Sequence, residues 1–135
     1  MHLRKLPTSL FILLLTLAGC GVFGGDAERG RKIFSAEEPI SAVNFACIEC
    51  HAVEPDGATG FMGQNLANIA NRAGSTVPGQ SAETYLRIAI LDPDAYLSGG
   101  YQEGIHPRTY ADALSDRDVA DLIAYLMTLR SGEDP

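Results

Sequence analysis

The amino-acid sequence is notable first for what is scarce in it. Its 135 residues include no tryptophan and only three cysteines, three histidines and three methionines, and its acidic residues outnumber the basic ones by 17 to 10. This excess of negative charge is a poor match for nucleic acid or an anionic lipid surface, and it suits a basic face on a partner protein. No internal repeat is present, and no alternation of apolar and polar residues predicts a half-buried strand.

The apolar run near the start of the chain is too short to cross a bilayer. It covers residues 10–17, whereas a membrane-spanning helix needs about 20 apolar residues. Arg4 and Lys5 precede the run and small residues follow it, which is typical of a secretory signal. The string "LAGC" at its end resembles the lipobox of bacterial lipoproteins, and this implies that Cys20 is acylated and begins the mature chain. An ordinary signal cleaved nearby and an uncleaved anchor are the alternatives.

These features predict the domain organisation. We expect residues 1–19 to be a lipoprotein signal peptide, 20–25 a lipidated tether, 26–131 one folded domain and 132–135 a C-terminal tail. Loss of Arg4 and Lys5 leaves eight basic against 17 acidic residues, a net charge of −9. Each buried methylene of an acyl chain contributes about 0.8 kcal/mol, so two or three chains would hold the protein durably at a membrane. The predicted location is the outer face of a bacterial membrane, on its periplasmic or cell-surface side.

Apolar residues at helical spacing predict an all-α fold of about four short helices. The first covers 27–34, capped by Asp26 and with Ile33 and Phe34 on its apolar face. The second covers 65–72 and is closed by Gly74. Residues 37–44 and 52–63 are expected to be irregular, the latter because it is rich in glycine.

Two further helices are predicted in the second half of the chain. One begins at Ser81, buries Tyr85, Ile88 and Ala89, and stops at Asp92-Pro93. The last follows Ser115, which can form a capping box with Asp118. Its apolar stripe contains Val119, Leu122, Ile123, Leu126 and Leu129. Four short helices joined by long loops make a weak core for a chain of this length, so we expect something other than side chains to fill the interior.

The string Cys47-Ile48-Glu49-Cys50-His51 indicates what fills it. C-x-x-C-H is the signature of c-type haem attachment. Two thiols separated by two residues can each add to a vinyl group on one edge of the porphyrin and form thioethers. The histidine that follows then lies beneath the iron, where its imidazole supplies one axial bond.

Two other chemistries use a C-x-x-C pair. A thioredoxin-type dithiol would be expected within a βαβ unit, which this sequence lacks. Half of a zinc site would need a second pair of ligands, but Cys20 is assigned to the anchor and only His106 remains. The combination of the motif with export therefore predicts one covalent haem c held by Cys47, Cys50 and His51.

At this point the chain resembles the class I mono-haem cytochromes c, over residues 25–130. The string "GDAERGRKIF" is similar to the first helix of that family and "LSDRDVADLIAYLMTLR" to its last. Between them, "GQNLANIANRAGSTVPG" and "SAETYLRIAILDPDAY" resemble stretches of bacterial oxidase-associated cytochrome c domains. The resemblance implies an all-α fold around one haem. It also implies that Gly30 and Phe34 meet the last helix near Tyr125 and Leu126.

One departure from the family pattern lies on the side of the proximal histidine. Family members usually have Gly-Pro-x-Leu where this chain has Gly63-Gln64-Asn65-Leu66. The carbonyl of that proline accepts a hydrogen bond from the proximal imidazole and raises its basicity. Gln64 keeps a carbonyl, so we expect the contact to survive. Arg72 is a candidate donor to a haem propionate, or simply an exposed arginine at a helix end.

The second departure concerns the sixth iron ligand. Where the family commonly has a Met-Pro dipeptide, this chain has His106-Pro107. If His51 is the proximal ligand and His2 leaves with the signal, His106 is the remaining imidazole, and we predict that it is the distal ligand. Met62 is the next candidate, Met127 is expected to pack at the periphery, and an open or water-bound iron is the other alternative. Imidazole favours ferric iron more than a thioether does, so the potential should be low for the family.

The resemblance implies an electron carrier, either a shuttle or a subunit of a respiratory or photosynthetic chain. Its partners would be redox complexes of the membrane, with no small-molecule substrate. No catalytic nucleophile or specially spaced acid-base pair suggests an enzyme. A haem-based gas or redox sensor with a displaceable His106 and a small peroxidase are the alternatives. The acids Asp92, Asp94 and Glu103 are expected to lie on a solvated surface.

Overall fold

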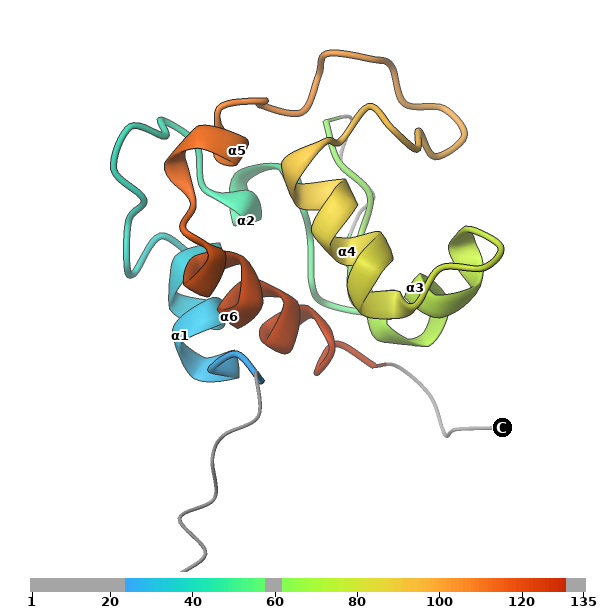
Figure 1. Cartoon of the computed structure of the whole chain (residues 1–135), viewed down its shortest axis with the longest axis horizontal. Helices are drawn as coiled ribbons and strands as arrows, with labels where there is room; N and C mark the ends of the chain where they lie inside the picture. Colours follow the sequence, from blue (N-terminus) through green and yellow to red (C-terminus); the bar gives the residue numbers. More distant parts are fainter. Residues whose placement is uncertain (1–23, 58–61, 131–135) are drawn as a thin grey trace, which may run out of the picture.

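The computed structural model describes residues 24–57 and 62–130, and over these residues it contains six helices and no strand. In chain order they are α1 (Ala27–Phe34), α2 (Cys47–Cys50), α3 (Ile69–Thr76), α4 (Ala82–Leu91), α5 (Tyr110–Ala113) and α6 (Asp116–Leu126) (Figure 1). The predicted all-α fold is confirmed. In the described part of the chain, no helix is long and apolar enough to cross a membrane. The predicted signal peptide, Cys20 and the tail lie outside the described residues.

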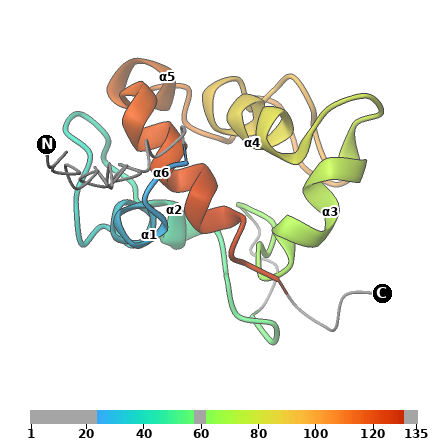
Figure 2. The same ribbon diagram turned by 60° about the horizontal axis from the view of Figure 1, so that its bottom comes forward.

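Helices α1 and α6 pack across each other, as Figures 1 and 2 both show. Their backbones come together at Gly30, where a Cβ atom would overlap the carbonyl group of Asp121. One turn further along, the rings of Phe34 and Tyr125 lie 5.4 Å apart between centroids. Both sets of contacts agree with the crossing that the family resemblance implies. The bounds of α1 and its cap also agree, because the Asp26 side chain accepts from the N–H groups of Glu28 and Arg29.

A buried carboxylate joins the two crossing helices. Asp121 is only 2 % exposed. It accepts hydrogen bonds from the Asp26 N–H and from Arg29 Nη1, each at 2.6 Å. The same guanidinium reaches Asp118 at 2.6 Å and Glu38 at 2.7 Å. Hydrogen bonds to Asp121 and Asp118 raise the pKa of Arg29 above its usual range. Because a buried carboxylate without partners would be costly, these contacts restrict how α1 and α6 can be placed.

Helix α3 begins at Ile69, four residues later than the sequence predicts. Asn65 and the residues after it form a turn, in which the Asn65 side-chain oxygen accepts from the Ala67 N–H at 2.8 Å. The Leu66 N–H donates to the Ala52 carbonyl at 2.7 Å. These long-range and local bonds satisfy the backbone without a helix. The start that the apolar spacing of Leu66, Ile69 and Ala70 predicts is therefore wrong.

The predicted end of α3 is also wrong, because Gly74 lies inside the helix. The helix ends at Thr76, and the next residue, Val77, is extended (φ −124°, ψ 119°). Val77 precedes Pro78, and a residue before proline disfavours the helical conformation. Proline, rather than glycine, therefore marks this boundary.

Helix α4 follows the prediction closely at both ends. Ser81 caps it by accepting from the Thr84 N–H, and Asp92 follows its last residue. The buried residues are Tyr85 and Leu86, so Leu86 takes the inward position that we had expected for Ile88. The capping box of Ser115 and Asp118 at the start of α6 is confirmed. Helices α2 and α5 were not predicted, because four residues are too few to show a helical period.

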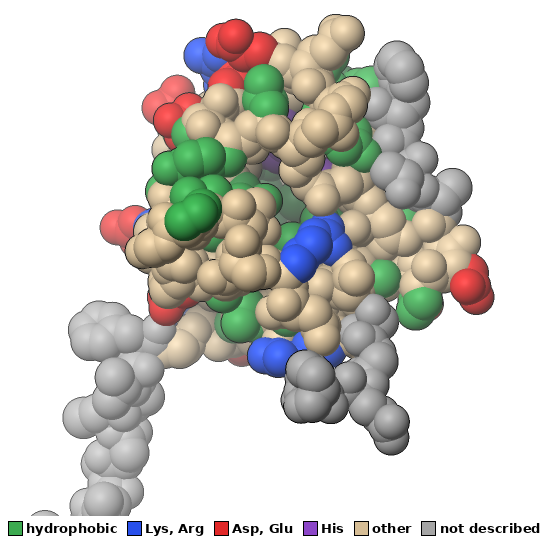
Figure 3. All heavy atoms as spheres, turned by 90° about the vertical axis from the view of Figure 1, so that its right-hand side faces the viewer, with side chains coloured by type: hydrophobic (Ala, Val, Ile, Leu, Met, Phe, Trp, Pro, Cys, Tyr) green, Lys and Arg blue, Asp and Glu red, His purple; other side chains and the backbone are tan. Residues whose placement is uncertain are grey.

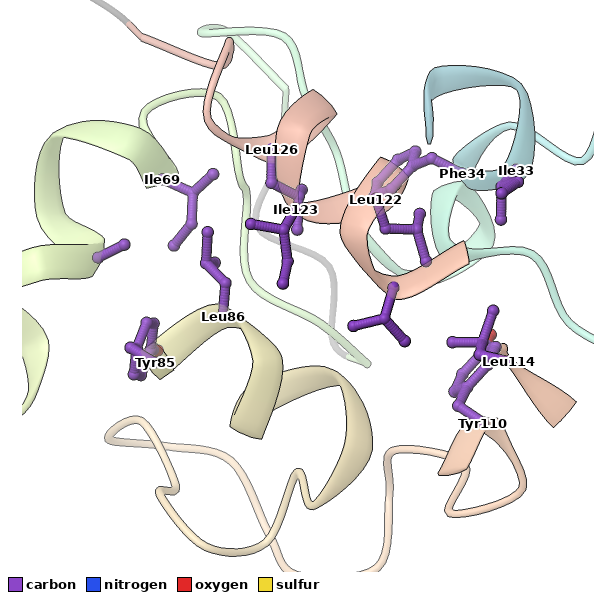
Figure 4. Packing of buried hydrophobic residues seen from close by; sticks show 12 residues of the cluster. Ile33, Phe34, Ile69, Tyr85, Leu86, Tyr110, Leu114, Leu122, Ile123 and Leu126 are labelled. Atoms are coloured by element: carbon purple, nitrogen blue, oxygen red, sulfur yellow. The ribbon is translucent and has the colours of Figure 1, made fainter. Parts of the chain in front are cut away.

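The buried core is small and collects side chains from five of the helices (Figure 4). Its members are Ile33, Phe34, Ile69, Ala73, Tyr85, Leu86, Tyr110, Leu114, Val119, Leu122, Ile123 and Leu126. Several of them, including Phe34, Leu86 and Leu122, also line a cavity. The core therefore forms one wall of an internal space and does not fill the interior.

We expect Gly30→Ala to destabilise the fold strongly, because the added methyl group would meet the Asp121 backbone. Overpacking of this kind costs about 1–3 kcal/mol, and this site is at the upper end. Gly74→Ala is the matched control, since its Cβ would have only ordinary contacts, 3.8 Å from Ala82. That change should be neutral or stabilising by about 1 kcal/mol. Guanidinium unfolding measures both, and equal effects would contradict the close crossing.

Candidate functional site

One face of the described chain is hollowed by a mainly apolar cavity. Its wall comes from all six helices and from the segments 45–46, 62–66 and 93–107. Histidine side chains are visible inside the hollow in Figure 3. Cys47, Cys50, His51 and His106 all line it. The structure thus brings four of the predicted site residues together in one cavity.

The two cysteines lie at the two ends of α2. Both are free thiols and half-buried. Burial raises the pKa of the Cys47 thiol to about 11, so this sulfur is protonated at neutral pH. The start of α2 is held by Glu49, whose carboxylate accepts from the Ala46 N–H at 3.0 Å. A single capped turn of helix therefore presents both sulfur atoms to the cavity.

His51 follows directly after α2, and its ring has a defined orientation and tautomer. Its Nδ1 lies 2.8 Å from the carbonyl oxygen of Gln64. A carbonyl can only accept, so Nδ1 carries the hydrogen and Nε2 keeps its lone pair. Burial lowers the pKa of His51 and favours the neutral ring. The prediction that Gln64 preserves this contact in place of proline is confirmed.

Gly63 allows the chain to pass close to the His51 ring. A Cβ at this position would lie 2.7 Å from Cε1 and 2.8 Å from Nδ1 of the imidazole, and 2.7 Å from the Cys50 carbonyl oxygen. Such distances are too short for real carbon contacts. A residue with a side chain would therefore push either the ring or the loop out of place.

The Gln64 side chain is itself fixed on both sides. It donates to Ser98 Oγ at 2.9 Å and accepts from Arg72 Nη2 at 2.9 Å. The same Arg72 nitrogen donates to the Asn65 carbonyl at 3.0 Å. Arg72 is thus neither a free arginine at a helix end nor dependent on a propionate for its hydrogen bonds. It supports the loop that orients His51.

His106 lies across the cavity from His51. The two ring centroids are 6.3 Å apart, with 51° between the ring planes. Two imidazoles bound to opposite sides of one first-row metal ion, each at about 2 Å, have ring centres about 6 Å apart. Burial, and then the nearby His51, lower the pKa of His106. Its Nδ1 is buried with no hydrogen-bond partner among the described residues.

The two methionines that were considered as ligands occupy different positions. Met62 is 49 % exposed and lines the cavity directly before Gly63, which packs on the His51 ring. Met127 follows α6, packs against the core and is not part of the cavity wall. Of the two remaining ligand candidates in the cavity wall, His106 is the one with a ring contact to His51.

Two residues near His106 make contacts that the sequence does not predict. The Tyr110 ring lies 5.4 Å from the His106 ring between centroids, and its hydroxyl donates to the Phe45 carbonyl at 2.8 Å. Asp94 was expected on a solvated surface, which is wrong: its side chain is only 10 % exposed. It accepts from the Gly104 N–H at 2.9 Å and from Arg108. Neither contact leaves a periodic signal, because the partners are far apart in sequence.

Comparison with known proteins agrees with this geometry. Residues 27–130 match the family profile described as Cytochrome c. The match covers α1 to α6 and therefore every residue of the cavity wall. No curated protein and no solved structure matches the chain. The chain belongs to the cytochrome c family, whose members transfer electrons through a covalently bound haem c.

Proposed function

We propose that this protein carries electrons through a haem c whose iron is bound by two histidines, His51 and His106. Cys47 and Cys50 would hold the haem by thioether bonds. The observation that carries the proposal is the 6.3 Å separation of the two imidazole rings across an apolar cavity. The buried, unpartnered Nδ1 of His106 and the two free thiols on α2 also fit such a group.

The haem supplies a one-electron ferric/ferrous couple, and the chain supplies its environment. His51 is oriented by the Gln64 carbonyl, which also makes the imidazole a stronger donor. The cavity wall around the two rings is mainly apolar, and both histidines are half-buried. With an imidazole on each side, no coordination position is left for a substrate. This arrangement suits electron transfer and does not require a catalytic acid or base.

The ligand pair determines the direction of the redox potential. Imidazole stabilises ferric iron more than the thioether of methionine does, and axial ligation sets haem potentials over a range of about 0.8 V. We therefore infer that this carrier works at a lower potential than a relative with His-Met ligation. Its partners would be redox complexes at a membrane that operate in that lower range, in a respiratory or photosynthetic chain.

The mouth of the cavity offers a surface for such partners. Exposed apolar side chains surround it, namely Phe45, Met62, Tyr96, Leu97 and Ile105, each at least 40 % exposed. The chain as a whole is acidic, with a formal net charge of −7. A partner with a basic, partly apolar face would match both features. The proposed state is a shuttle or subunit tethered to the membrane through an acylated Cys20.

His106→Met should raise the redox potential of the holoprotein by roughly 0.1 V or more, within the span of about 0.8 V that axial ligands cover. His106→Ala should abolish the six-coordinate low-spin spectrum. Met62→Leu is the control and should leave both properties unchanged. A redox-monitored absorbance titration measures all three. An unchanged low-spin spectrum in His106→Ala would refute the assignment.

The spectrum of the wild type also separates the alternative functions. A high-spin ferric wild type would favour the peroxidase, and rapid binding of carbon monoxide to the reduced wild type would favour the sensor.

Gly63→Ala should disturb the His51 side of the iron, because the added carbon would contact the His51 ring. We expect a loss of about 1–3 kcal/mol in stability together with a partial shift of the iron to high spin. Gly99→Ala is the matched control, since nothing lies within 4 Å of its added carbon. Absorbance and magnetic spectra of the two holoproteins measure the spin state. Identical spectra would argue against His51 as the ligand held by this loop.

Cys20→Ser should release the holoprotein from membranes, because an acyl chain contributes about 0.8 kcal/mol of membrane affinity per methylene. The measurement is the share of haem in the soluble and membrane fractions of expressing cells, with incorporation of labelled fatty acid as a second readout. Absence of fatty-acid label from the wild type would rule out a lipid anchor at this position.

A further inference from the structure

We propose that Asp94 is the positioning residue of the distal ligand: its carboxylate clamps the segment 104–108 and so holds His106 at the iron. The inference rests on the proposed function, because it assumes that His106 is an iron ligand. It assigns to Asp94 a specific part in keeping that ligand in place. Asp94 follows α4, is nearly buried, and contacts both flanks of the loop that carries His106.

The two oxygens of the carboxylate act on opposite sides of His106. Oδ1 accepts from the Gly104 N–H at 2.9 Å, two residues before the histidine. Oδ2 accepts from Nη2 of Arg108, two residues after it. One side chain thus closes the five-residue segment into a loop. Breaking both bonds would allow the segment to open at both ends.

The other contacts of the segment lead forward to α5, where the His106 ring packs on Tyr110 and the Arg108 carbonyl accepts from the Ala111 N–H at 3.3 Å. Residues 104–109 adopt no regular secondary structure, Gly104 has a positive φ of 77°, and Pro107 has no N–H to donate. Arg108 also approaches Glu103 at 3.3 Å, but that pair is exposed and lies in the same loop. A pair within one loop does not connect the segment to α4. The Asp94 carboxylate is therefore the main tether between this segment and the preceding part of the described chain.

Asp94 is itself well anchored. It follows α4 by three residues, and α4 is fixed in the core by Tyr85 and Leu86. The Asp92 N–H donates to the Ile88 carbonyl at 2.7 Å and the Asp92 carbonyl accepts from Ala95 at 3.0 Å. The Asp94 side chain is 10 % exposed, whereas the Arg108 side chain is 65 % exposed. The carboxylate is thus the fixed half of the clamp and the loop is the half that it restrains.

The rate at which carbon monoxide binds to the ferrous holoprotein tests the clamp, because the gas can bind only when His106 leaves the iron. Loss of hydrogen bonds to a charged group should make Asp94→Ala bind about tenfold faster or more. Asp94→Asn keeps an oxygen that can accept from Gly104, and Arg108→Gln removes only one flank. Both should therefore be intermediate. Asp92→Ala is the control, because it removes an acid from the same loop without touching the segment 104–108.

The Asp94→Asn variant separates positioning from charge. If Asp94 acted only through its negative charge, Asp94→Asn and Asp94→Ala would have equal rates and equal potentials. That result would overturn the proposal, as would wild-type rates in both Asp94 variants. If Asp94→Ala does not yield folded holoprotein, Asp94→Asn and Arg108→Gln decide, because both should still bind the gas faster than Asp92→Ala.

Failure of the clamp and failure of the proposed function give different results. If carbon monoxide binds slowly to wild type and to Asp94→Ala but rapidly to His106→Ala, the clamp is overturned and the ligand assignment stands. Equal rates in wild type and His106→Ala would show that His106 is not a ligand, and would overturn both. If carbon monoxide binds slowly to wild type and faster to both His106→Ala and Asp94→Ala, the result supports the clamp and the ligand assignment together.

Discussion

Two imidazole rings held 6.3 Å apart across an apolar cavity are the constraint on which the rest of the proposed site depends. Each ring is held by its own set of contacts. His51 follows a capped turn of helix, packs against Gly63 and donates to the Gln64 carbonyl. His106 lies in an irregular segment whose flanks are held by Asp94. Because an iron between the rings needs both at once, small displacements on either side would change the ligation.

The helices supply the rigid frame for these two loops. Helices α1 and α6 cross at Gly30, and the buried Asp121 accepts hydrogen bonds from Arg29 and the Asp26 N–H. This crossing fixes one wall of the cavity. The Gln64 side chain then connects the His51 loop to Ser98, in the same connection that contains Asp94. The loops that carry His51 and His106 are therefore linked through one segment. The side-chain core can remain small because the haem would fill much of the interior.

Sequence reasoning succeeds where the signal is local. Helices with a capping side chain and a stripe of apolar residues, such as α1, α4 and α6, have the predicted bounds or nearly so. The C-x-x-C-H string likewise predicts the haem that the family carries. Helix α3 was misplaced because its start depends on a bond from Leu66 to Ala52 and its end on Pro78. The burial of Asp94 could not be predicted, since it follows from partners ten and fourteen residues away that pattern alone does not bring together.

One redox titration of the wild-type holoprotein tests directly whether His51 and His106 bind the iron. Absorbance monitored while the potential is varied reports the spin state, the ligand type and the midpoint potential together. We predict a six-coordinate low-spin ferric haem without the charge-transfer band of methionine sulfur, and a midpoint potential below that of His-Met relatives. A ferric spectrum with that band, or a high-spin ferric haem, would contradict ligation by His51 and His106.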